Sequence, residues 1–557
     1  MGKNFLGEVL GMGKIYLNQV GFTPDSTKKA VFNFEGDDYK VVNSNGECVY
    51  TGKAVHFGKD DISGEDVSVA DFSDLKENGK YNVISKDAKS ASFSIGENVY
   101  ETLMKDICKC FYYLRCGDAL TEEFAGKYYH KPCHMTKATV YGEDAEPVDV
   151  TGGWHDAGDF GRYSTAGAVA VAHILYGVRF FENLLDVKFD IPAVSCDKGI
   201  LPDILAEVKV ELDFLMKMQR QDGAVWHKVT TFNHAPFVMP EDDKEELFLF
   251  SVSSLATADI AAVFALACSI YKDYDKDYAD KLASCSKKAY KWLKENPDEL
   301  LFYNPDGSNT GQYDEAEDIS NRFWAASALY EAFGDKDYYE DIIREKERLE
   351  AFSEKAKEKG FTADAFTGLG WAEVAGLGAL SIMLKNEEGD LLNEMKKHFE
   401  AESDRLVNVA KKNGFGLCMR AEDFIWGSNM ELLKYLMVLT TTDKKIVHKD
   451  EYKVAITSGL DYLLGCNSMD VSYVTGNGEK AFKNPHLRPT AVDDIEEPWP
   501  GLVSGGPNTG LQDEKARELP KDLAPMKCYL DDIACYSLNE ITIYWNSPLV
   551  FVMAGLL

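Results

Sequence analysis

The sequence Gly-Gly-Trp-His-Asp-Ala-Gly-Asp-Phe-Gly-Arg-Tyr at residues 152–163 combines reactive side chains with a permissive backbone. Asp156 and Asp159 lie three positions apart, and His155 precedes the first of them. Because glycine allows turns and close approaches that other residues resist, both carboxylates can share a tight loop, where their repulsion raises one pKa or lets them share a water. Two interpretations stay open: a surface cluster of Asx-turns, or a site that holds a hydrolytic water.

Length and charge narrow the class of protein. A chain of 557 residues exceeds one ordinary core and predicts two or more domains. Its 60 Lys and Arg against 92 Asp and Glu give a net charge of −32. This surface repels nucleic acid and anionic membranes, so we expect neither as a partner. A neutral ligand such as a sugar meets no such penalty.

Targeting signals are not evident in the sequence. No apolar run reaches about 18 residues, so no transmembrane helix is expected. Residues 1–14 lack the continuous apolar segment of a signal peptide. The 12 cysteines are too sparse for a disulfide scaffold and favour a reducing compartment. We expect a cytoplasmic location; the alternative is a secreted protein whose signal peptide has been removed.

Residues 15–95 alternate short apolar runs with turn clusters, such as residues 23–26 and 43–46. About seven strands with a turn every ten or so residues predict an immunoglobulin-like β-sandwich, to which we assign residues 1–97. The expected strands include Ile15–Leu17, Ala30–Phe34, Tyr39–Val42, Val67–Ala70, Lys80–Ile84 and Ser92–Ile95.

After Gly96 the apolar residues recur at helical spacing, and about a dozen helices are expected up to residue 557. No Val/Ile-rich strands alternate with them, which argues against a βαβ fold. Paired helices would suit an α/α toroid over residues 98–557, with long functional loops at 225–246, 296–318 and 466–527. The expected helices are Tyr100–Cys116, Ala166–Leu184, Asp203–Met218, Leu255–Tyr271, Tyr278–Leu293, Ile319–Phe333, Tyr338–Lys357, Trp371–Leu384, Leu391–Lys412, Phe424–Leu439, Tyr452–Leu464 and Ile533–Ala554.

Four residues form a candidate metal set: Cys116, Cys133, His134 and His155. Two thiolates and two imidazoles make a closed tetrahedral set, which suits structural zinc and leaves no position for a catalytic water. Their spacing is not that of a short zinc finger, so unrelated core thiols and histidines remain the alternative.

The C-terminal region offers a third carboxyl group. Glu540 follows Ser537 at the spacing of a helix capping box. The alternative is a catalytic acid near a helix start, with Tyr536, Tyr544 and Trp545 close enough in sequence to desolvate it and stack on a sugar. Upstream, His486 and Arg488 either hydrogen-bond substrate hydroxyls or form a solvated turn.

Together these stretches resemble glycoside hydrolase family 9, the inverting β-glucanases, in its cellulase and cellodextrinase branch with an N-terminal immunoglobulin-like domain. Residues 152–163 resemble the motif G-G-W-x-D-A-G-D-x-G-x-Y, and residues 18–22 resemble the start of the immunoglobulin-like module. The family's C-terminal signatures match Gly465–Asn467, Ser472–Gly476, Pro485–Arg488 and Asn539–Asn546. The likeness spans nearly the whole chain and implies an (α/α)6 barrel behind the sandwich.

The resemblance implies a role for each carboxyl group. Asp159 matches the general base that activates water, Asp156 its partner, and Glu540 the general acid. Inverting enzymes hold acid and base about 6.5–9.5 Å apart to admit the water, with the acid's pKa raised and the base ionised.

Substrate contacts are implied in the same way. His486 and Arg488 match binding positions, whereas Leu487 stands where the family often has a second histidine. Trp545 and Tyr536 are candidate subsite aromatics, because the apolar faces of sugars stack on rings.

The resemblance also implies two kinds of metal and no organic cofactor. Structural zinc would be bound by Cys116, Cys133, His134 and His155. Calcium, which prefers carboxylate and carbonyl oxygens, would be bound by two further sets, of which the second is the weaker match. These sets are Thr490, Asp493 and Ile495, and Asp314, Glu317 and Asp318.

The implied activity is that of an inverting β-1,4-glucan hydrolase, an endoglucanase or cellodextrinase, whose partner is a β-glucan oligosaccharide or polysaccharide. The chain ends shortly after Asn546 without a carbohydrate-binding module, which favours soluble cello-oligosaccharides or mixed-linkage glucans. Three alternatives are an exo-β-glucosaminidase of the same family, a non-catalytic carbohydrate-binding protein and a hydrolase with catalytic zinc.

Overall fold

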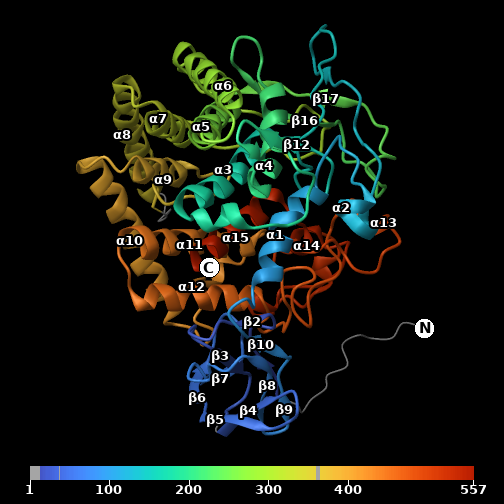
Figure 1. Ribbon diagram of the computed structural model, residues 1–557, viewed down its shortest axis with the longest axis vertical. Coiled ribbons are helices and arrows are strands. Elements are labelled where there is room, and N and C mark those ends of the chain that lie inside the picture. The colour runs from blue at the N-terminus through green and yellow to red at the C-terminus, as the bar shows by residue number, and fades with distance from the viewer. Residues whose placement is uncertain (1–12, 37, 359–363) are drawn as a thin grey trace.

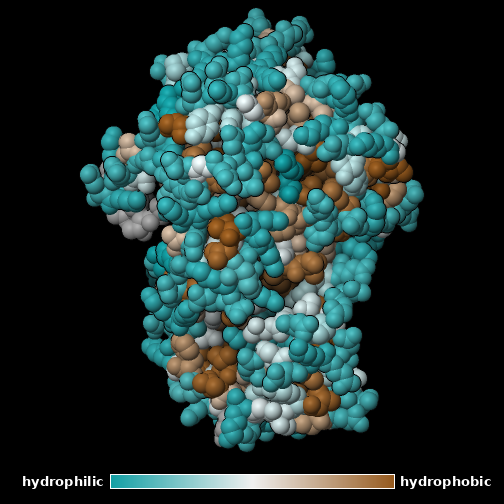
Figure 2. Space-filling model, turned by 60° about the vertical axis from the view of Figure 1, so that its left-hand side comes forward, coloured by the Kyte–Doolittle hydropathy of each residue, from teal (hydrophilic) through white to brown (hydrophobic). Residues whose placement is uncertain are grey.

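The computed structural model describes residues 13–36, 38–358 and 364–557. A small β-sandwich lies at one end of an elongated molecule and a larger helical body makes up the rest (Figure 1). The predicted first domain, 1–97, includes residues 1–12, which lie outside the described residues. The side shown in Figure 2 is mostly hydrophilic, with apolar side chains in separate patches.

The sandwich consists of two sheets. One has the strand order β1-β3-β7-β6 and the other β2-β10-β8-β4-β5, with β9 paired to β8. Each predicted strand corresponds to an observed one, but four observed strands were not predicted. β5 and β6 have mostly exposed side chains that do not alternate with buried ones, and β2 and β9 have only two residues each. The strands are β1 (Ile15–Tyr16), β2 (Gly21–Phe22), β3 (Lys29–Phe32), β4 (Asp38–Asn43), β5 (Cys48–Lys53), β6 (Val55–Lys59), β7 (Asp66–Asp71), β8 (Gly79–Ser85), β9 (Ala88–Lys89) and β10 (Phe93–Ile95).

Residues 18–22 join the sandwich to the helical body. The amide of Gln19 donates to the carbonyl of Leu464 at 2.9 Å, and Asn18 Nδ2 donates to Asp461 Oδ1 at 2.9 Å. Phe22 then enters the sandwich core, where it packs edge-on against Phe72. One short segment therefore belongs to both cores and fixes the two regions together.

The helical body has an inner layer of strongly apolar helices. Every residue of α5 except Cys268 is buried, because the helix is surrounded by other elements. This helix is long and apolar enough to cross a membrane, but 94% of its apolar window is buried inside the protein, as expected of a core helix. The inner helices are α3 (Ser164–Phe180), α5 (Ser254–Tyr271), α7 (Ile319–Phe333), α9 (Ala375–Lys385), α11 (Ser428–Thr441) and α15 (Ile543–Leu556).

The outer helices are amphipathic. In α6, Tyr278, Leu282, Ser286 and Ala289 are buried at helical spacing while the lysines between them face solvent. Pairs of inner and outer helices pack side by side, and α15 packs against both α3 and α11. This is an (α/α)6 barrel. The outer helices are α1 (Glu101–Tyr113), α4 (Asp203–Lys217), α6 (Lys276–Glu295), α8 (Lys336–Glu358), α10 (Asp390–Ala410) and α12 (Asp450–Leu463).

Short strands at one end of the barrel were not predicted. A four-stranded sheet of order β11-β17-β16-β12 occupies part of the expected loop 225–246 and its surroundings. Each strand has only two to four residues, too few for a periodic signal. These strands are β11 (Thr139–Val140), β12 (Arg162–Tyr163), β16 (Lys228–Thr231) and β17 (Leu247–Leu249); two further pairs are β13 (Ser195–Cys196) with β14 (Gly199–Ile200), and β15 (Val225–Trp226) with β18 (Val252–Ser253).

The predicted helix Ile533–Ala554 is wrong in its first half. A four-residue helix, α14 (Tyr536–Asn539), ends before Glu540, whose backbone is extended, and α15 begins only at Ile543. Thr542 supplies the N-cap of α15, since its side chain accepts the amide hydrogen of Trp545. Glu540 therefore lies in a break between two helices. Two short helices, α2 (Glu122–Ala125) and α13 (Arg488–Val492), complete the α-helices of the described residues.

Candidate active site

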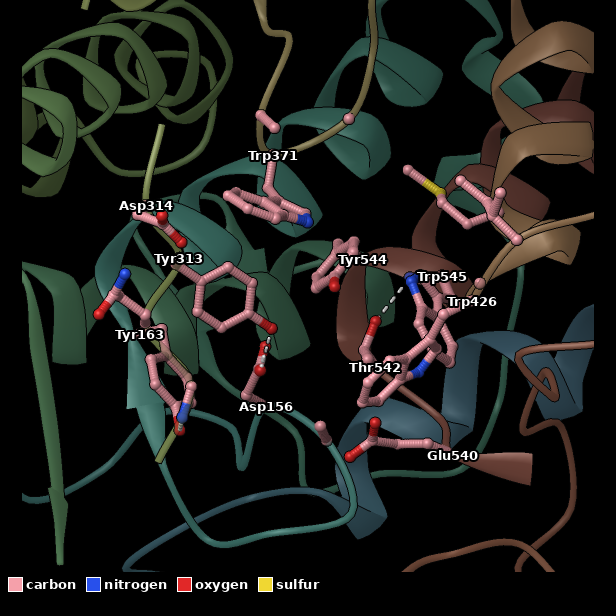
Figure 3. Close-up of a pocket in the computed structure, with 18 of the residues that line it drawn as sticks. Asp156, Tyr163, Tyr313, Asp314, Trp371, Trp426, Glu540, Thr542, Tyr544 and Trp545 are labelled. Carbon is pink, nitrogen blue, oxygen red and sulfur yellow. Dashed lines mark hydrogen bonds between the residues drawn. The ribbon is translucent and has the colours of Figure 1, made fainter. Parts of the chain in front are cut away.

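A cleft of about 760 Å³ opens at one end of the barrel, where the turn at residues 152–163 meets loops from the other inner helices. Polar and aromatic side chains from many segments form its wall (Figure 3). Its lining includes Asp156, Asp159, Tyr163, His234, Tyr313, Asp314, Trp371, Glu373, Trp426, Glu431, Lys434, Glu540, Tyr544 and Trp545.

The turn is held rigidly from behind. Trp154 donates its backbone amide to Glu211 Oε2 of α4 at 2.6 Å, and the Arg162 guanidinium donates to the carbonyl of Gly152 at 2.8 Å. Gly153 has a φ of +80° and lies so close to Phe214 that a Cβ would stand 2.6 Å from the ring. Only glycine fits this position, which explains part of the motif.

Two distant segments, residues 486–488 and 540–543, meet at the turn. The amide of Ile543 donates to the carbonyl of Asp156 at 2.8 Å, and the amide of Arg488 donates to the carbonyl of Gly158 at 3.2 Å. His486 forms an isolated β-bridge with Glu540. These backbone contacts hold the Glu540 segment against the aspartate turn.

The capping-box interpretation of Glu540 is wrong. Ser537 lies inside α14, and its hydroxyl donates to Asp513. Glu540 instead lines the cleft, and its carboxyl group points toward the side of the cleft that carries Asp156 (Figure 3). Enclosure by protein, and then the negative charge of Asp159, raise its pKa from 4.5 to about 8.

Asp159 has the opposite protonation preference. Burial alone would raise its pKa, but His234, Arg488 and Tyr163 hold it below the ordinary value. The Tyr163 hydroxyl donates to Asp159 Oδ2 at 3.0 Å, and His234 Nδ1 lies 3.4 Å from the same oxygen. The Asp159 carboxylate therefore stays ionised where the Glu540 carboxyl stays protonated.

Asp156 lies beside them with one oxygen unused. Tyr313 donates its hydroxyl to Asp156 Oδ2 at 2.5 Å (Figure 3). Asp156 Oδ1 is buried and has no hydrogen-bond partner among the described residues. Burial and the charge of Asp159 raise the pKa of Asp156. A buried polar atom without a partner requires a ligand or an ordered water to satisfy it.

The four predicted substrate-binding residues differ in position. Trp545 lines the cleft together with Tyr544, Trp371 and Trp426. Tyr536 is 37% exposed, with its ring centroid 5.3 Å from that of Trp426, outside the cleft lining.

His486 and Arg488 lie behind the cleft lining. Arg488 is buried, and its Nε donates to the carbonyl of Ala235 at 2.8 Å. His486 Nδ1 lies 2.6 Å from the carbonyl of Ile533. Both side chains thus contact backbone carbonyls of neighbouring segments and are not among the residues that line the cleft.

The four candidate zinc ligands converge. Their ligand atoms all lie within 4.8 Å of one another, and all four residues are buried. Cys133 Sγ is 3.9 Å from His155 Nε2, which is 3.3 Å from His134 Nδ1. The second nitrogen of His134 lies 3.2 Å from Asp243 Oδ2, the arrangement that orients a metal-binding histidine. Together with Cys116, these residues form a set that can hold a metal ion.

The first calcium set forms one turn. Asp493 follows α13, where Oδ1 accepts the amide hydrogen of Ile495 at 2.9 Å, and Thr490 donates its hydroxyl to the carbonyl of Leu487 at 3.0 Å.

The members of the second calcium set have separate contacts. Asp314 is exposed in the cleft. Glu317 accepts hydrogen bonds from the amide and hydroxyl of Ser320 at the start of α7, and Asp318 pairs with Arg322 at 2.8 Å.

Sequence reasoning missed several residues of the cleft wall. Tyr163 lies inside the quoted motif but received no role. His234 and Tyr313 come from the long loops expected to be functional, without a local pattern to single them out. Trp371 was placed in a helix, but α9 begins only at Ala375 and Trp371 lies in the preceding turn. These residues come together only in the folded structure, so no local sequence pattern identifies them.

The fold and the site define a glycoside hydrolase: an (α/α)6 barrel whose cleft holds an acid–base pair of carboxyl groups among aromatic rings. A family model described as Glycosyl hydrolase family 9 matches residues 100–553, and one described as a cellulase N-terminal Ig-like domain matches residues 12–90. The chain belongs to glycosyl hydrolase family 9, which confirms the resemblance seen in its motifs.

Similar proteins support this assignment over the full length. A cellodextrinase of Butyrivibrio fibrisolvens is 71% identical, covering 98% of this chain and 100% of its own. Endoglucanase D of Acetivibrio thermocellus is 34% identical over 97% of this chain and 83% of its own. The structure of AaCel9A in complex with cellobiose-like isofagomine is 33% identical, with a TM-score of 0.88 over 98% of this chain and 99% of that chain. A zinc-binding triple mutant of endoglucanase J30 is 30% identical, with a TM-score of 0.88 over 96% of this chain and 99% of that chain.

Proposed function

We propose that the cleft hydrolyses β-1,4-linked glucose oligosaccharides with inversion at the anomeric carbon. The observation that carries this proposal is the pair Glu540 and Asp159, two carboxyl groups in one cleft with oppositely shifted pKa values. One member stays protonated and the other ionised at neutral pH, as acid–base hydrolysis of a glycosidic bond requires. The names of the similar cellodextrinase and endoglucanases support a cello-oligosaccharide substrate.

Glu540 acts as the general acid. With a pKa of about 8 it carries a proton at neutral pH, which it gives to the glycosidic oxygen as the bond to the leaving sugar breaks. At this point Asp159 is neutral, because it has taken a proton from the attacking water. Once Asp159 has released that proton to solvent, its charge and the enclosure disfavour the Glu540 carboxylate, which takes up a proton from solvent before the next turnover.

Asp159 acts as the general base. It removes a proton from a water molecule that attacks the anomeric carbon from the face opposite the leaving group. Tyr163 and His234 stabilise the ionised carboxylate before the reaction.

Asp156 helps to hold the attacking water. Its unpartnered Oδ1 is a free acceptor in the buried part of the cleft, while Tyr313 fixes the other oxygen. Asp156 and Asp159 together then orient the water's two hydrogens. The backbone bond from Ile543 to Asp156 couples this arrangement to the segment that bears Glu540.

Aromatic rings bind the sugar units. Trp371, Trp426, Tyr544 and Trp545 line the cleft, and indole and phenol rings stack on the apolar faces of pyranoses. Such contacts do not distinguish internal from terminal bonds, so the proposal covers both an endoglucanase and a cellodextrinase.

The metals are proposed as structural. Cys116, Cys133, His134 and His155 would hold zinc in a closed tetrahedral set, which fits their ligand types and proximity. Because His155 precedes Asp156, the ion would restrain the catalytic turn. Calcium at Thr490, Asp493 and Ile495, and at Asp314, Glu317 and Asp318, stays a prediction, as does the cytoplasmic location.

Time-resolved proton NMR of cellotetraose hydrolysis tests the function. We expect cleavage to release the new hemiacetal first as the α-anomer. A β-anomer as the first product would contradict inversion, and no cleavage would contradict the proposal. Chitosan oligosaccharides in a parallel sample test the glucosaminidase alternative, which requires faster release from the amino sugar.

A further inference from the structure

Three charged side chains line the cleft without a part in the chemistry above. Glu373 lies in the turn before α9, and Glu431 and Lys434 lie one helical turn apart on α11. The inner helices α5 and α15 are strongly apolar, whereas α3 and α7 carry the Arg179–Glu331 ion pair. Glu431 and Lys434 differ from that pair because they line the cleft, where a ligand can reach them.

Lys434 retains donors for a ligand. Its Nζ lies 2.7 Å from Glu431 Oε1, and the two side chains are 14% and 24% exposed. An ammonium group has three N–H donors. Within the described ranges Glu431 is the one group that pairs with it, so two donors can reach into the cleft. Burial lowers the pKa of Lys434, but Glu431 and Glu373 raise it above its ordinary value, so the amine is charged.

The turn that presents Trp371 rests on the lysine stem. Gly370 and Glu373 form an isolated β-bridge across this turn. A Cβ at Gly370 would stand 3.3 Å from Lys434 Cδ and 3.4 Å from its Nζ. The indole and the charged group are therefore parts of one wall.

Contacts of Trp371 show where this wall lies relative to the catalytic residues. Its ring meets Tyr313 edge to face, with centroids 5.0 Å apart at 84°, and Tyr313 hydrogen-bonds to Asp156. The Tyr313 ring thus lies between Trp371 and Asp156 (Figure 3). A sugar stacked on Trp371 would lie beyond the reacting unit.

We propose that Trp371, Glu373, Glu431 and Lys434 form a specificity subsite that binds one unsubstituted glucosyl unit away from the scissile bond. The inference rests on the proposed function and deepens it. The indole would cover the apolar face of the sugar. The carboxylates would accept hydrogen bonds from its hydroxyl groups, and the ammonium would donate to a hydroxyl oxygen, each bond strengthened by the charge.

The charges also define what the subsite rejects. With two carboxylates and one ammonium, the subsite has a net negative charge that repels an acidic substituent such as a carboxymethyl group. A neutral glucosyl unit meets no such penalty. The subsite therefore favours plain cello-oligosaccharides long enough to reach it.

Lys434→Met tests the subsite, because it keeps the stem against Gly370 and removes the ammonium. kcat and KM are measured for each oligosaccharide from cellotriose to cellohexaose. We expect kcat/KM to fall about tenfold, mainly through KM, only for chains long enough to reach the subsite. Lys434→Arg should recover part of this loss. Glu431→Gln should show the same dependence on chain length.

Lys411→Met is the matched control, since Lys411 pairs with Glu451 at 2.6 Å on the outer helices. It should leave every oligosaccharide unaffected. No change at any length in Lys434→Met, or an equal loss at all lengths together with a lower melting temperature, would overturn the subsite and leave a structural ion pair. Calorimetric binding of cellohexaose to Glu540→Gln, with and without Lys434→Met, separates the two proposals, because weaker binding in the double variant supports the subsite even if no turnover occurs.

Discussion

Two regions of the barrel contain clusters of buried acidic residues, but only one of them opens to a ligand. In the cleft, Asp156, Asp159 and Glu540 face a space that a sugar can enter. Before α7, Glu315 is buried beside Asp259, and both accept hydrogen bonds from Asn321 at 3.3 and 3.0 Å.

Protonation is perturbed in both regions. Burial and the charge of Asp259 raise the pKa of Glu315, much as burial and Asp159 raise that of Glu540. The difference is that the cleft also contains a carboxylate whose pKa is lowered, and that its groups are accessible. Crowded carboxyl groups alone do not make an acid–base pair; opposite pKa shifts and access to a ligand do.

The largest effect should follow from removing either member of the pair. Glu540→Gln and Asp159→Asn should each lower kcat by about 10²–10⁴-fold on cellotetraose, because a proton donor or acceptor is lost. Calorimetry should show nearly unchanged binding of the oligosaccharide. Near-normal turnover in the Glu540 variant would show that Glu540 is not the general acid.

The pH dependence of kcat should reflect the opposite pKa shifts of Glu540 and Asp159. Glu540 must be protonated to act, so kcat should fall about tenfold per pH unit above about 8. Asp159, with its lowered pKa, should stay active well into the acid range. A pH–rate profile with its alkaline limb near pH 5 would contradict the raised pKa.

The raised pKa of Glu540 should also make the stability of the protein depend on pH. A carboxyl group whose pKa is higher in the folded than in the unfolded state binds more protons when folded, so its contribution is lost as pH rises from 4.5 to about 8. Glu540→Gln should therefore melt at a higher temperature than the natural protein at pH 8, with a smaller difference at pH 4.5. Calorimetric scans at both pH values measure this.

Removing one of the four candidate metal ligands should affect the cleft, because His155 belongs to the turn at residues 152–163. Cys133→Ser should reduce bound zinc and lower the melting temperature by roughly 5 °C, because a ligand of the buried set is lost. Elemental analysis and scanning calorimetry measure both. Cys285→Ser, at a half-buried cysteine on α6 outside the cluster, is the control. Unchanged zinc content in Cys133→Ser would contradict the proposed zinc site.

The smallest effect should come from the second acidic region. Glu315→Gln replaces a buried carboxyl group whose pKa is raised by burial and by the charge of Asp259. Because it lies outside the cleft lining, kcat should change less than about twofold and the melting temperature by less than about 2 °C. If calcium raises the melting temperature of the natural protein but not of this variant, the region before α7 holds a cation. A bound cation would then be a further difference between the region before α7 and the cleft.

Much of the architecture was predictable because it repeats locally. Strands such as Tyr39–Val42 and helices such as Ile319–Phe333 carry their period in their own residues. The glycines at 153 and 158 mark where neighbouring atoms leave no room for a Cβ, which would stand 2.6 Å from the Phe214 ring at one position and 2.2 Å from the His486 carbonyl oxygen at the other. A motif of this kind records tertiary contacts inside a short stretch.

Other structural features have no recognisable pattern in the local sequence. β5 and β6 lie exposed at sheet edges, and the strands near the cleft are too short for a pattern. The capping-box spacing of Ser537 and Glu540 is local and was misleading, because α14 ends before Glu540 and Thr542 supplies the N-cap of α15. Residue spacing could not reveal this break.

The sequence by itself determined the two-domain plan, the aspartate turn and the residue types able to bind a metal, because each depends on periods or spacings within one segment. Only the tertiary structure decided which distant groups act together. It brought Glu540 opposite the turn, His234 and Tyr313 onto the two aspartates, and Lys434 beside Trp371. The shifts in pKa depend on burial and on charges from other segments, and those exist only once the chain has folded.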